Sequence, residues 1–234
     1  AVVYQQQGEN TKALEYNRKA LAIKLTQGET HPSVGRTYLN MAQVYNQQGE
    51  YVKALEYYHK ALTINLTLGE THPNVGITYG NMATVYSKQG EYVKALEYYH
   101  KALAIFITRG ETHPNVCFTY RNMAQVYSEQ GEYVKALKYY HKALTIQLTR
   151  DETHLDVGTT YHHLGNVYYL QGEYVKALEY YHKALAIQLT QGETHPDVGN
   201  TYCGMAIVYS KQGEYVKALE YYHKALAIDL TQGE

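Results

Sequence analysis

Apolar residues recur at spacings of three and four along residues 75–89 and again along residues 92–108. The first segment has them at Val75, Tyr79, Met82, Ala83 and Tyr86. The second segment has them at Tyr92, Ala95, Leu96, Tyr99, Ala102, Leu103 and Phe106. This spacing places each set on one face of an α-helix. We therefore predict two amphipathic helices, helix A and helix B, the second about 25 Å long.

The two-helix pattern is repeated along the chain. The sequence GEYVKALEYYHKAL at residues 90–103 recurs unchanged from Gly49, Gly172 and Gly213, and from Gly131 it recurs with one residue changed. The glycine before each copy of helix B returns every 41 residues without an insertion. Units that cannot bury an apolar face alone must stack on their neighbours. We therefore predict an all-α solenoid of helix-turn-helix repeats.

The period divides the chain into repeats of one solenoid domain. The predicted repeats are residues 34–74, 75–115, 116–156 and 157–197, with a partial repeat at 1–33 and a truncated last repeat at 198–234. Because both ends of the chain fall inside a repeat, we expect the sequence to be a window of a longer array.

The connectors carry turn and capping residues. Gly90 follows helix A, and glycines that can close the last turn in a left-handed conformation also follow helix B, at Gly28, Gly69, Gly110, Gly192 and Gly233. We predict as the N-caps of helix A the polar residues Ser33, Asn74, Asn115, Asp156 and Asp197. We expect a structural role, bonding the backbone at the turn, for His31, His72, His113, His154 and His195. One connector departs from the pattern, at Asp151 and Leu155, and should be the loosest joint.

The segment TYHHLGNVYYLQGEYVKALEYYHKAL, residues 160–185, resembles a tetratricopeptide repeat. The positions that carry the resemblance are Tyr161, Leu164, Gly165 and Tyr168 in helix A, and Ala177, Tyr181 and Ala184 in helix B. The long unit with its His-Pro connector resembles the repeats of kinesin light chains, although the period is one residue shorter than theirs. Most copies also have alanine where the family often has glycine, at Ala42, Ala83, Ala124 and Ala206. The resemblance covers essentially the whole chain and implies a right-handed α-solenoid (superhelix) with a concave groove lined by the A helices.

The repeats can be compared with one another, which separates a constant helix from a variable one. Helix B is almost unchanged between copies, whereas helix A varies at one set of offsets, which we call the variable face. Its members are Arg36, Leu39, Gln43, Asn46 and Gln47; Ile77, Gly80, Thr84, Ser87 and Lys88; Phe118, Arg121, Gln125, Ser128 and Glu129; Thr159, His162, Asn166, Tyr169 and Leu170; and Asn200, Cys203, Ile207, Ser210 and Lys211. In tetratricopeptide proteins these offsets line the groove, so the resemblance implies that the variable face binds a ligand. The alternative is neutral drift of exposed positions, but drift predicts equal variation on the exposed side of helix B, which is not seen.

An asparagine series lies beside the variable face. Asn40, Asn81 and Asn122 occupy the same offset in three successive A helices, and His163 and Gly204 break the series. A side-chain amide can pair with the N–H and C=O groups of an extended peptide of any sequence. The resemblance to kinesin light chains implies the same role, because asparagines at this offset contact the bound backbone there. The alternative is a hydrogen bond between helices that joins adjacent repeats.

Composition narrows the class of protein. The chain has 234 residues, 45% of them hydrophobic, and a net charge of -1, so it can bury a core and has no basic stripe for nucleic acid. No run approaches the roughly 18 apolar residues of a membrane span, and the N-terminus does not read as a signal peptide. Cys117 and Cys203 fit neither a disulfide framework nor a metal site, which favours the reducing cytoplasm.

No constellation for catalysis or metal binding emerges from the motifs. The chain has no phosphate-binding loop, HExxH motif or nucleophile elbow, so we predict no enzymatic activity and no cofactor. A histidine recurs at one offset of helix B, but stacked helices lie about 10 Å apart and zinc needs donors at roughly 2 Å. Adjacent His162 and His163 point about 100° apart on one helix and do not form a ligand pair. Cys203 has no cationic neighbour in sequence and is expected to be a small apolar residue.

We predict a protein-binding scaffold that binds an extended segment along the variable face. Tyr169 is the one tyrosine outside the five repeated tyrosine offsets, which makes it a candidate anchor. The face has four basic residues, Arg36, Lys88, Arg121 and Lys211, against the acidic Glu129, so an acidic ligand with apolar anchors is expected. The alternative is a structural array that stacks head to tail into dimers or filaments. In the first helix B, polar Asn10, Thr11 and Asn17 replace Tyr, Val and Tyr, which indicates a cap and argues against assembly through that end.

Overall fold

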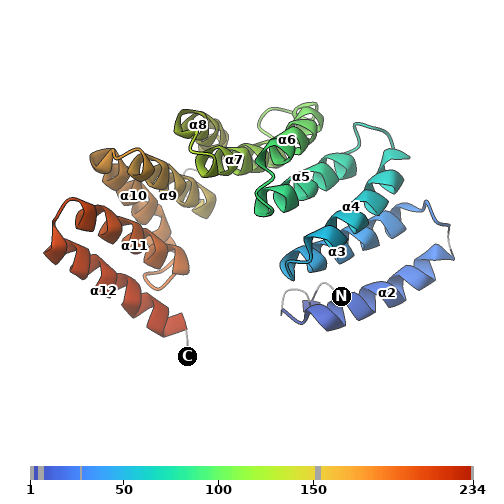
Figure 1. The fold of residues 1–234 in the computed structure, drawn as a ribbon, viewed down its shortest axis with the longest axis horizontal. Coiled ribbons are helices and arrows are strands. Elements are labelled where there is room, and N and C mark those ends of the chain that lie inside the picture. Colours follow the sequence, from blue (N-terminus) through green and yellow to red (C-terminus); the bar gives the residue numbers. More distant parts are fainter. Residues whose placement is uncertain (1–2, 5–7, 27, 151–153, 233–234) are drawn as a thin grey trace. The chain divides into compact units, whose positions relative to one another are not determined.

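The computed structural model describes residues 3–4, 8–26, 28–150 and 154–232. This part of the chain forms eleven α-helices and one short 3₁₀ helix and contains no strand (Figure 1). The A helices are α3 (Pro32–Gln47), α5 (Pro73–Lys88), α7 (Pro114–Glu129), α9 (Leu155–Leu170) and α11 (Pro196–Lys211). The B helices are α2 (Asn10–Leu25), α4 (Tyr51–Leu66), α6 (Tyr92–Ile107), α8 (Tyr133–Leu148), α10 (Tyr174–Gln188), followed by η1 (Leu189–Gln191), and α12 (Tyr215–Gln232). The helix pairs follow the predicted 41-residue period.

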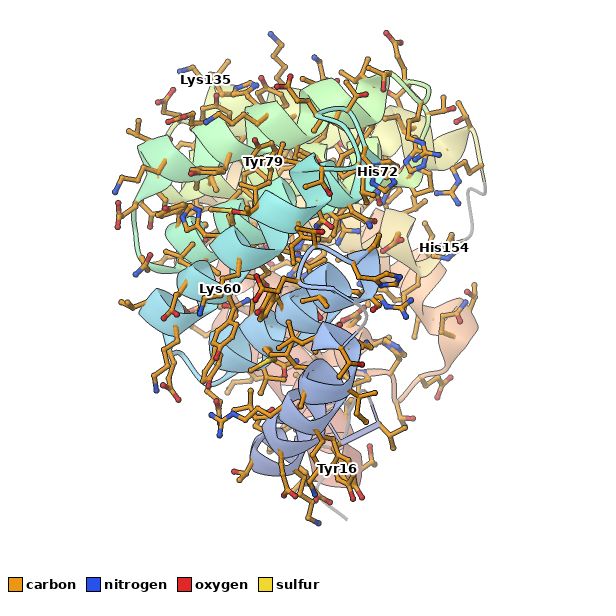
Figure 2. The ribbon with its side chains drawn as sticks, turned by 90° about the vertical axis from the view of Figure 1, so that its right-hand side faces the viewer. Tyr16, Lys60, His72, Tyr79, Lys135 and His154 are labelled. Carbon is orange, nitrogen blue, oxygen red and sulfur yellow. The ribbon has the colours of Figure 1, made fainter. Side chains whose placement is uncertain are left out.

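The A helices begin earlier than predicted, and their N-caps are histidines. The backbone N–H of Asn74 donates to Nδ1 of His72 at 3.2 Å, and the same bond caps α9 from His154. Figure 2 labels both histidines. The prediction that Ser33, Asn74, Asn115, Asp156 and Asp197 are the caps was therefore wrong, because the histidine two residues earlier accepts the capping bond in every A helix, including α9, which begins with Leu155 instead of proline. The expected bond between the connector histidines and the backbone is confirmed.

The predicted glycine turns are present. Gly90 has a φ of 76° in the left-handed region, and Gly69 has a φ of 115°, which also favours glycine. Gly233 and Asp151 lie outside the described residues, as does the centre of the connector that was expected to be loosest. In the described part of the chain, no helix is both long and apolar enough to cross a membrane.

The chain divides into two compact units, residues 1–119 and 120–234. In unit 1, α3 packs on α4 and α5 packs on α6, and α4 also packs on α5 (Figure 1). One core cluster of this unit joins α3, α4 and α5 through Tyr45, Tyr58 and Met82, each at most 5% exposed. The side chain of Tyr58 thus buries the apolar faces of two successive repeats against each other.

Unit 2 repeats this arrangement with α8 to α12. The helices α9 and α10 pack together, as do α11 and α12, and α10 also packs on α11. Tyr181 of α10 is 1% exposed and belongs to a cluster with Val198 and Met205 of α11. A Cβ atom at Gly165 would lie 2.7 Å from the ring of Tyr181, so the close packing of α9 on α10 requires glycine there. The repeated inward tyrosine therefore has the same packing role in both units.

Candidate functional site

The variable face and the asparagine series lie on the A helices, and each A helix carries at least one exposed member of the face. The exposed members are Arg36, Gln47, Ile77, Lys88, Phe118, Gln125, Glu129, Leu170, Asn200, Ile207 and Lys211, and the partly buried ones are Leu39, Asn40, Gln43, Asn46, Gly80, Asn81, Thr84, Ser87, Arg121, Asn122, Ser128, Thr159, His162, Asn166, Tyr169, Cys203 and Ser210. Phe118 has 57% of its surface exposed, which is high for an aromatic residue in a packed helix. The variable face is therefore accessible at some positions and engaged in packing at others.

In unit 1, side chains of the variable face connect α3, α5 and α6. The Nζ of Lys88 donates to Oδ1 of Asn46 at 3.2 Å, which joins α5 to α3. The hydroxyl of Thr84 lies 3.0 Å from the hydroxyl of Tyr99, an inward tyrosine of α6. Leu39 packs against the core cluster that contains Tyr58. The amide and hydroxyl groups here are held in place by the scaffold beneath them.

In unit 2, the offset occupied by Leu39 and Gly80 in unit 1 carries polar side chains that reach the next A helix. The Nη1 of Arg121 lies 2.9 Å from Oδ1 of Asp156, at the first turn of α9. The Nδ1 of His162 lies 3.0 Å from the hydroxyl of Thr201 on α11. These two side chains therefore join successive A helices.

The asparagine series ends in unit 2, where the residues that break it lie over inward tyrosines. The Nδ2 atoms of Asn81 and Asn122 are buried and have no hydrogen-bond partner among the described residues, so they form no bond between helices. At the same offset, His163 stacks on Tyr140 with ring centroids 5.6 Å apart. A Cβ at Gly204 would lie 2.8 Å from Tyr181. The breaks in the series therefore change what covers the tyrosine of the preceding helix B.

Tyr169 and Cys203 are less accessible than a free anchor or nucleophile would be. The ring of Tyr169 lies 6.1 Å from that of Tyr174, and the residue packs against the core cluster of unit 2. Burial, together with the nearby carboxylate of Asp229, raises the pKa of the Cys203 thiol. A raised pKa keeps the thiol protonated and so disfavours nucleophilic reactivity.

The two adjacent histidines of α9 are held neutral by their surroundings. Burial, helped by the neighbouring His162 and by Arg121, lowers the pKa of His163 to about 4. Burial also lowers the pKa of His162, against an opposing effect of Asp197. The hydroxyl of Thr201 donates to Oε1 of Gln188 at 2.8 Å. Neutral His162 can therefore donate its Nδ1–H to the oxygen of the same hydroxyl.

Gln188 occupies an offset of helix B at which the apolar pattern of the sequence singled out Phe106 alone. The position is buried in four repeats and differs among them: Asn65, Phe106, Gln147 and Gln188. The Nδ2 of Asn65 donates to the hydroxyl of Thr78 at 3.1 Å and so joins α4 to the next A helix. Variation at one position of an otherwise constant helix is the sequence signal that could have identified this set.

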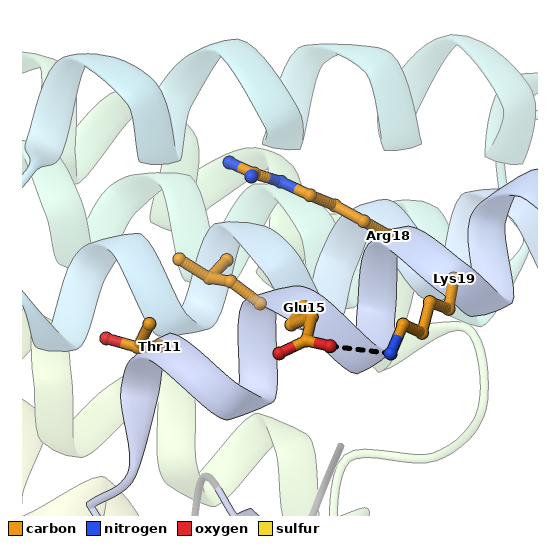
Figure 3. A pocket seen from close by; sticks show the side chains of 5 residues that line it. Thr11, Glu15, Arg18 and Lys19 are labelled. Atoms are coloured by element: carbon orange, nitrogen blue, oxygen red, sulfur yellow. Dashed lines mark hydrogen bonds and ion pairs between the residues drawn. The ribbon is translucent and has the colours of Figure 1, made fainter.

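Two further features of the described residues bear on ligand binding. A hollow of about 440 Å³ lies along α2 and is lined by Thr11, Leu14, Glu15, Arg18 and Lys19 (Figure 3). Glu15 pairs with Lys19 at 2.5 Å and Arg18 donates to the hydroxyl of Tyr45, so its charged groups already have protein partners. No three His, Cys, Asp or Glu side chains gather into a metal site in the part that the structure describes.

The sequence and the fold were compared with known proteins. The family model of the tetratricopeptide repeat matches residues 1–67, 33–107, 74–149 and 156–231. The structure is similar to that of BtubC (BKLC) from P. vanneervenii, with a TM-score of 0.78 and 24% identity over 100% of this chain and 93% of that one.

Two other solved structures share the fold. The nearly identical TPR-like repeats of a putative kinesin light chain from Podosopora anserina match with a TM-score of 0.72 and 24% identity, over 86% of this chain and 98% of that one. The apo form of RapI matches with a TM-score of 0.70 and 21% identity, over 97% of this chain and 94% of that one. A comparison with curated protein sequences gives no match.

Proposed function

Because this chain belongs to the tetratricopeptide repeat family, whose members generally serve as protein-interaction scaffolds, we propose that it binds an extended acidic segment of a partner protein along the variable face. The role is non-enzymatic: the A helices present amide, hydroxyl and cationic groups on a scaffold held by the constant B helices. The observation that carries the proposal is the unpaired charge of unit 1. Arg36 and Lys88 form no ion pair among the described residues, and no acidic side chain belongs to the variable face there.

The asparagine series supports an extended ligand. The Nδ2 atoms of Asn81 and Asn122 are buried without a hydrogen-bond partner among the described residues, and we propose that the Oδ1 atom of each amide accepts from the ligand. A carbonyl oxygen accepts a hydrogen bond from a backbone N–H whatever side chain that residue carries. Asparagines one repeat apart can therefore hold an extended backbone, while the cations of the face select its charge.

Selection from a random-sequence peptide library tests the proposal. The enriched peptides should contain more Asp and Glu than the starting library, and their binding should weaken as salt rises. Changing Asn81 and Asn122 together to alanine should weaken binding and leave the melting temperature unchanged. A lowered melting temperature would show that the two asparagines stabilise the fold. Binding that does not change with salt concentration would contradict the proposal of an acidic ligand.

Self-association is the second candidate, and one observation favours it. Leu219, Leu226 and Leu230 of α12 are 59%, 52% and 66% exposed, whereas Leu185, which occupies the offset of Leu226 in α10, is 7% exposed. Apolar area of this kind can be covered by the first helix of a following repeat or by a second copy of the chain. The polar residues of the first helix B were expected to form a cap that opposes assembly through that end. Asn17 is 2% exposed, so its side chain does not contribute to an outward polar surface. A mass that rises with concentration in light scattering would favour self-association.

A further inference from the structure

Successive repeats meet where helices A and B of one repeat are followed by helix A of the next, and we call each such place a joint. At four joints the polar side chain at the offset of Gln188 forms a hydrogen bond with the following helix A. The bonds join Lys24 to the hydroxyl of Thr37 at 2.8 Å, Asn65 to the hydroxyl of Thr78 at 3.1 Å, Gln147 to the carbonyl oxygen of Asp156 at 3.0 Å, and Gln188 to the hydroxyl of Thr201 at 2.8 Å. A hydrogen bond is directional, so it limits how far the two helices can turn against each other.

The joint before α7 lacks this bond. Its offset is occupied by Phe106, whose side chain has no hydrogen-bond donor or acceptor. The threonine of this joint, Thr119, donates within α7 to the carbonyl oxygen of Asn115 at 2.6 Å. Phe106 instead stacks on His113, just before α7, with ring centroids 6.3 Å apart and an angle of 6° between the rings. Because apolar contact is non-directional, it stabilises the joint and still allows the packed helices to slide.

The A helices differ at the same joint. Arg121 joins α7 to α9, and His162 joins α9 to α11. The same offset of α5 is occupied by Gly80, and no neighbouring heavy atom comes within 4 Å of the place where its Cβ would sit. Glycine has no side chain with which to reach the next helix A. The joint before α7 therefore lacks the bond from helix B and the side chain that could form a bond from helix A.

The boundary between the two compact units lies at this part of the chain. Unit 1 ends at Thr119 and unit 2 begins at Tyr120, both within α7. We propose that the joint before α7 is a hinge at which the array of repeats bends. Phe106 and Gly80 permit the bending, because they replace the directional bonds of the other joints with an aromatic stack and a missing side chain. The hinge does not depend on the nature of any ligand.

Distances between pairs of spin labels measure the bending. The labels are attached to cysteines that replace exposed valines at one offset of helix B, Val52, Val134 and Val216, which are between 74% and 78% exposed. The hinge pair, at 52 and 134, spans the joints before α5 and α7, and the reference pair, at 134 and 216, spans those before α9 and α11. Cys203→Ala removes the more accessible natural thiol, whereas Cys117 is 7% exposed and is retained. The distance distribution should be wider for the hinge pair than for the reference pair.

Phe106→Asn tests the cause of the bending. It gives the joint before α7 the residue that Asn65 supplies to the joint before α5. The surroundings match, because Asn65 lies against Gly35 as Phe106 lies against Gly76. The new amide should bond to α7 and narrow the distribution of the hinge pair to the width of the reference pair. Phe106→Leu is the control, since leucine has no hydrogen-bonding group, and it should leave the width of the hinge pair unchanged.

The reverse change tests the hinge even if Phe106→Asn does not fold, which thermal melts will show. Gln188→Phe removes the bond to Thr201 from the joint before α11, and Gly158 lies beside it as Gly76 lies beside Phe106. This variant should widen the distribution of the reference pair. Equal widths for the two pairs in the parent protein, or a wider distribution for the reference pair, would overturn the hinge. Unchanged widths in folded Phe106→Asn or folded Gln188→Phe would overturn the role of this offset.

Discussion

The two compact units use one offset of helix A in opposite ways. In unit 1 this offset holds Leu39, which packs into the core, and Gly80, which leaves the surface open. In unit 2 it holds Arg121 and His162, which bond to the next A helix. The comparison teaches that a constant scaffold tolerates variation at this position, because the side chain there can pack into its own unit, bond to the next A helix or be absent.

The same comparison changes the interpretation of the charge on the variable face. Counted by sequence, Arg121 adds to the basic surplus, but its guanidinium is already paired with Asp156. In unit 1 neither Arg36 nor Lys88 has such a partner among the residues that the structure describes. The attraction for an acidic segment is therefore expected to be stronger at unit 1 than at unit 2.

The largest expected effect comes from the buried helix-B position. Phe106 is 3% exposed, packs on the backbone of Gly76 and stacks on His113 with ring centroids 6.3 Å apart. Phe106→Ala should lower the free energy of unfolding by about 3–5 kcal/mol, because it leaves a cavity in unit 1. Urea denaturation measures the loss. Phe118→Ala, the exposed control, should change stability by about 0.5 kcal/mol or less, and equal losses in the two variants would contradict the assignment of Phe106 to the core.

The next effect concerns acid and belongs to unit 2. Burial lowers the pKa of His163 in the folded protein to about 4, below the ordinary histidine value of 6.5. As the pH falls through 6.5, the unfolded chain takes up a proton that the folded protein does not accept until about pH 4, so stability is lost across this window. Above it the contribution is constant. The slope from this group should approach about 1.4 kcal/mol for each pH unit.

The chain itself supplies the control variant for this acid effect. His163→Asn places at this offset the residue that Asn122 provides one repeat earlier. Thermal melts between pH 7 and pH 4 should show a shallower loss for the variant than for the parent. Parallel curves would mean that other groups cause the acid sensitivity.

The smallest effect is expected from the ion pair that joins α7 to α9. The side chain of Arg121 is 21% exposed and that of Asp156 is 58% exposed, so solvent screens their attraction. Asp156→Asn should cost less than about 1 kcal/mol, and the cost should disappear in high salt. The same change releases the charge of Arg121 and should strengthen binding of acidic peptides. If binding is unchanged, unit 2 does not take part in recognising the acidic segment.

The helices and their turns could be predicted from the sequence because their causes are local. Each signal spans only a few residues: the apolar spacing, the glycine before each helix B and the His-Pro connector. The predicted N-cap lies two residues after the observed one: Asn74 was expected, and His72 caps the helix. A proline at the first helical position, here Pro73, indicates this earlier start. The variable face was also visible in the sequence, since it required only a comparison of repeats.

The sequence by itself determined the two-helix repeat, its 41-residue period and the positions that differ between copies. Only the tertiary structure decided which of those positions are occupied by contacts with the next repeat and which stay open. Arg121 meets Asp156 from 35 residues away, and His162 meets Thr201 from 39 residues away. Gly80 has no such partner, and no neighbouring heavy atom comes within 4 Å of the place where its Cβ would sit. Helix periodicity acts over a few residues, whereas these partners are set by the stacking of whole repeats.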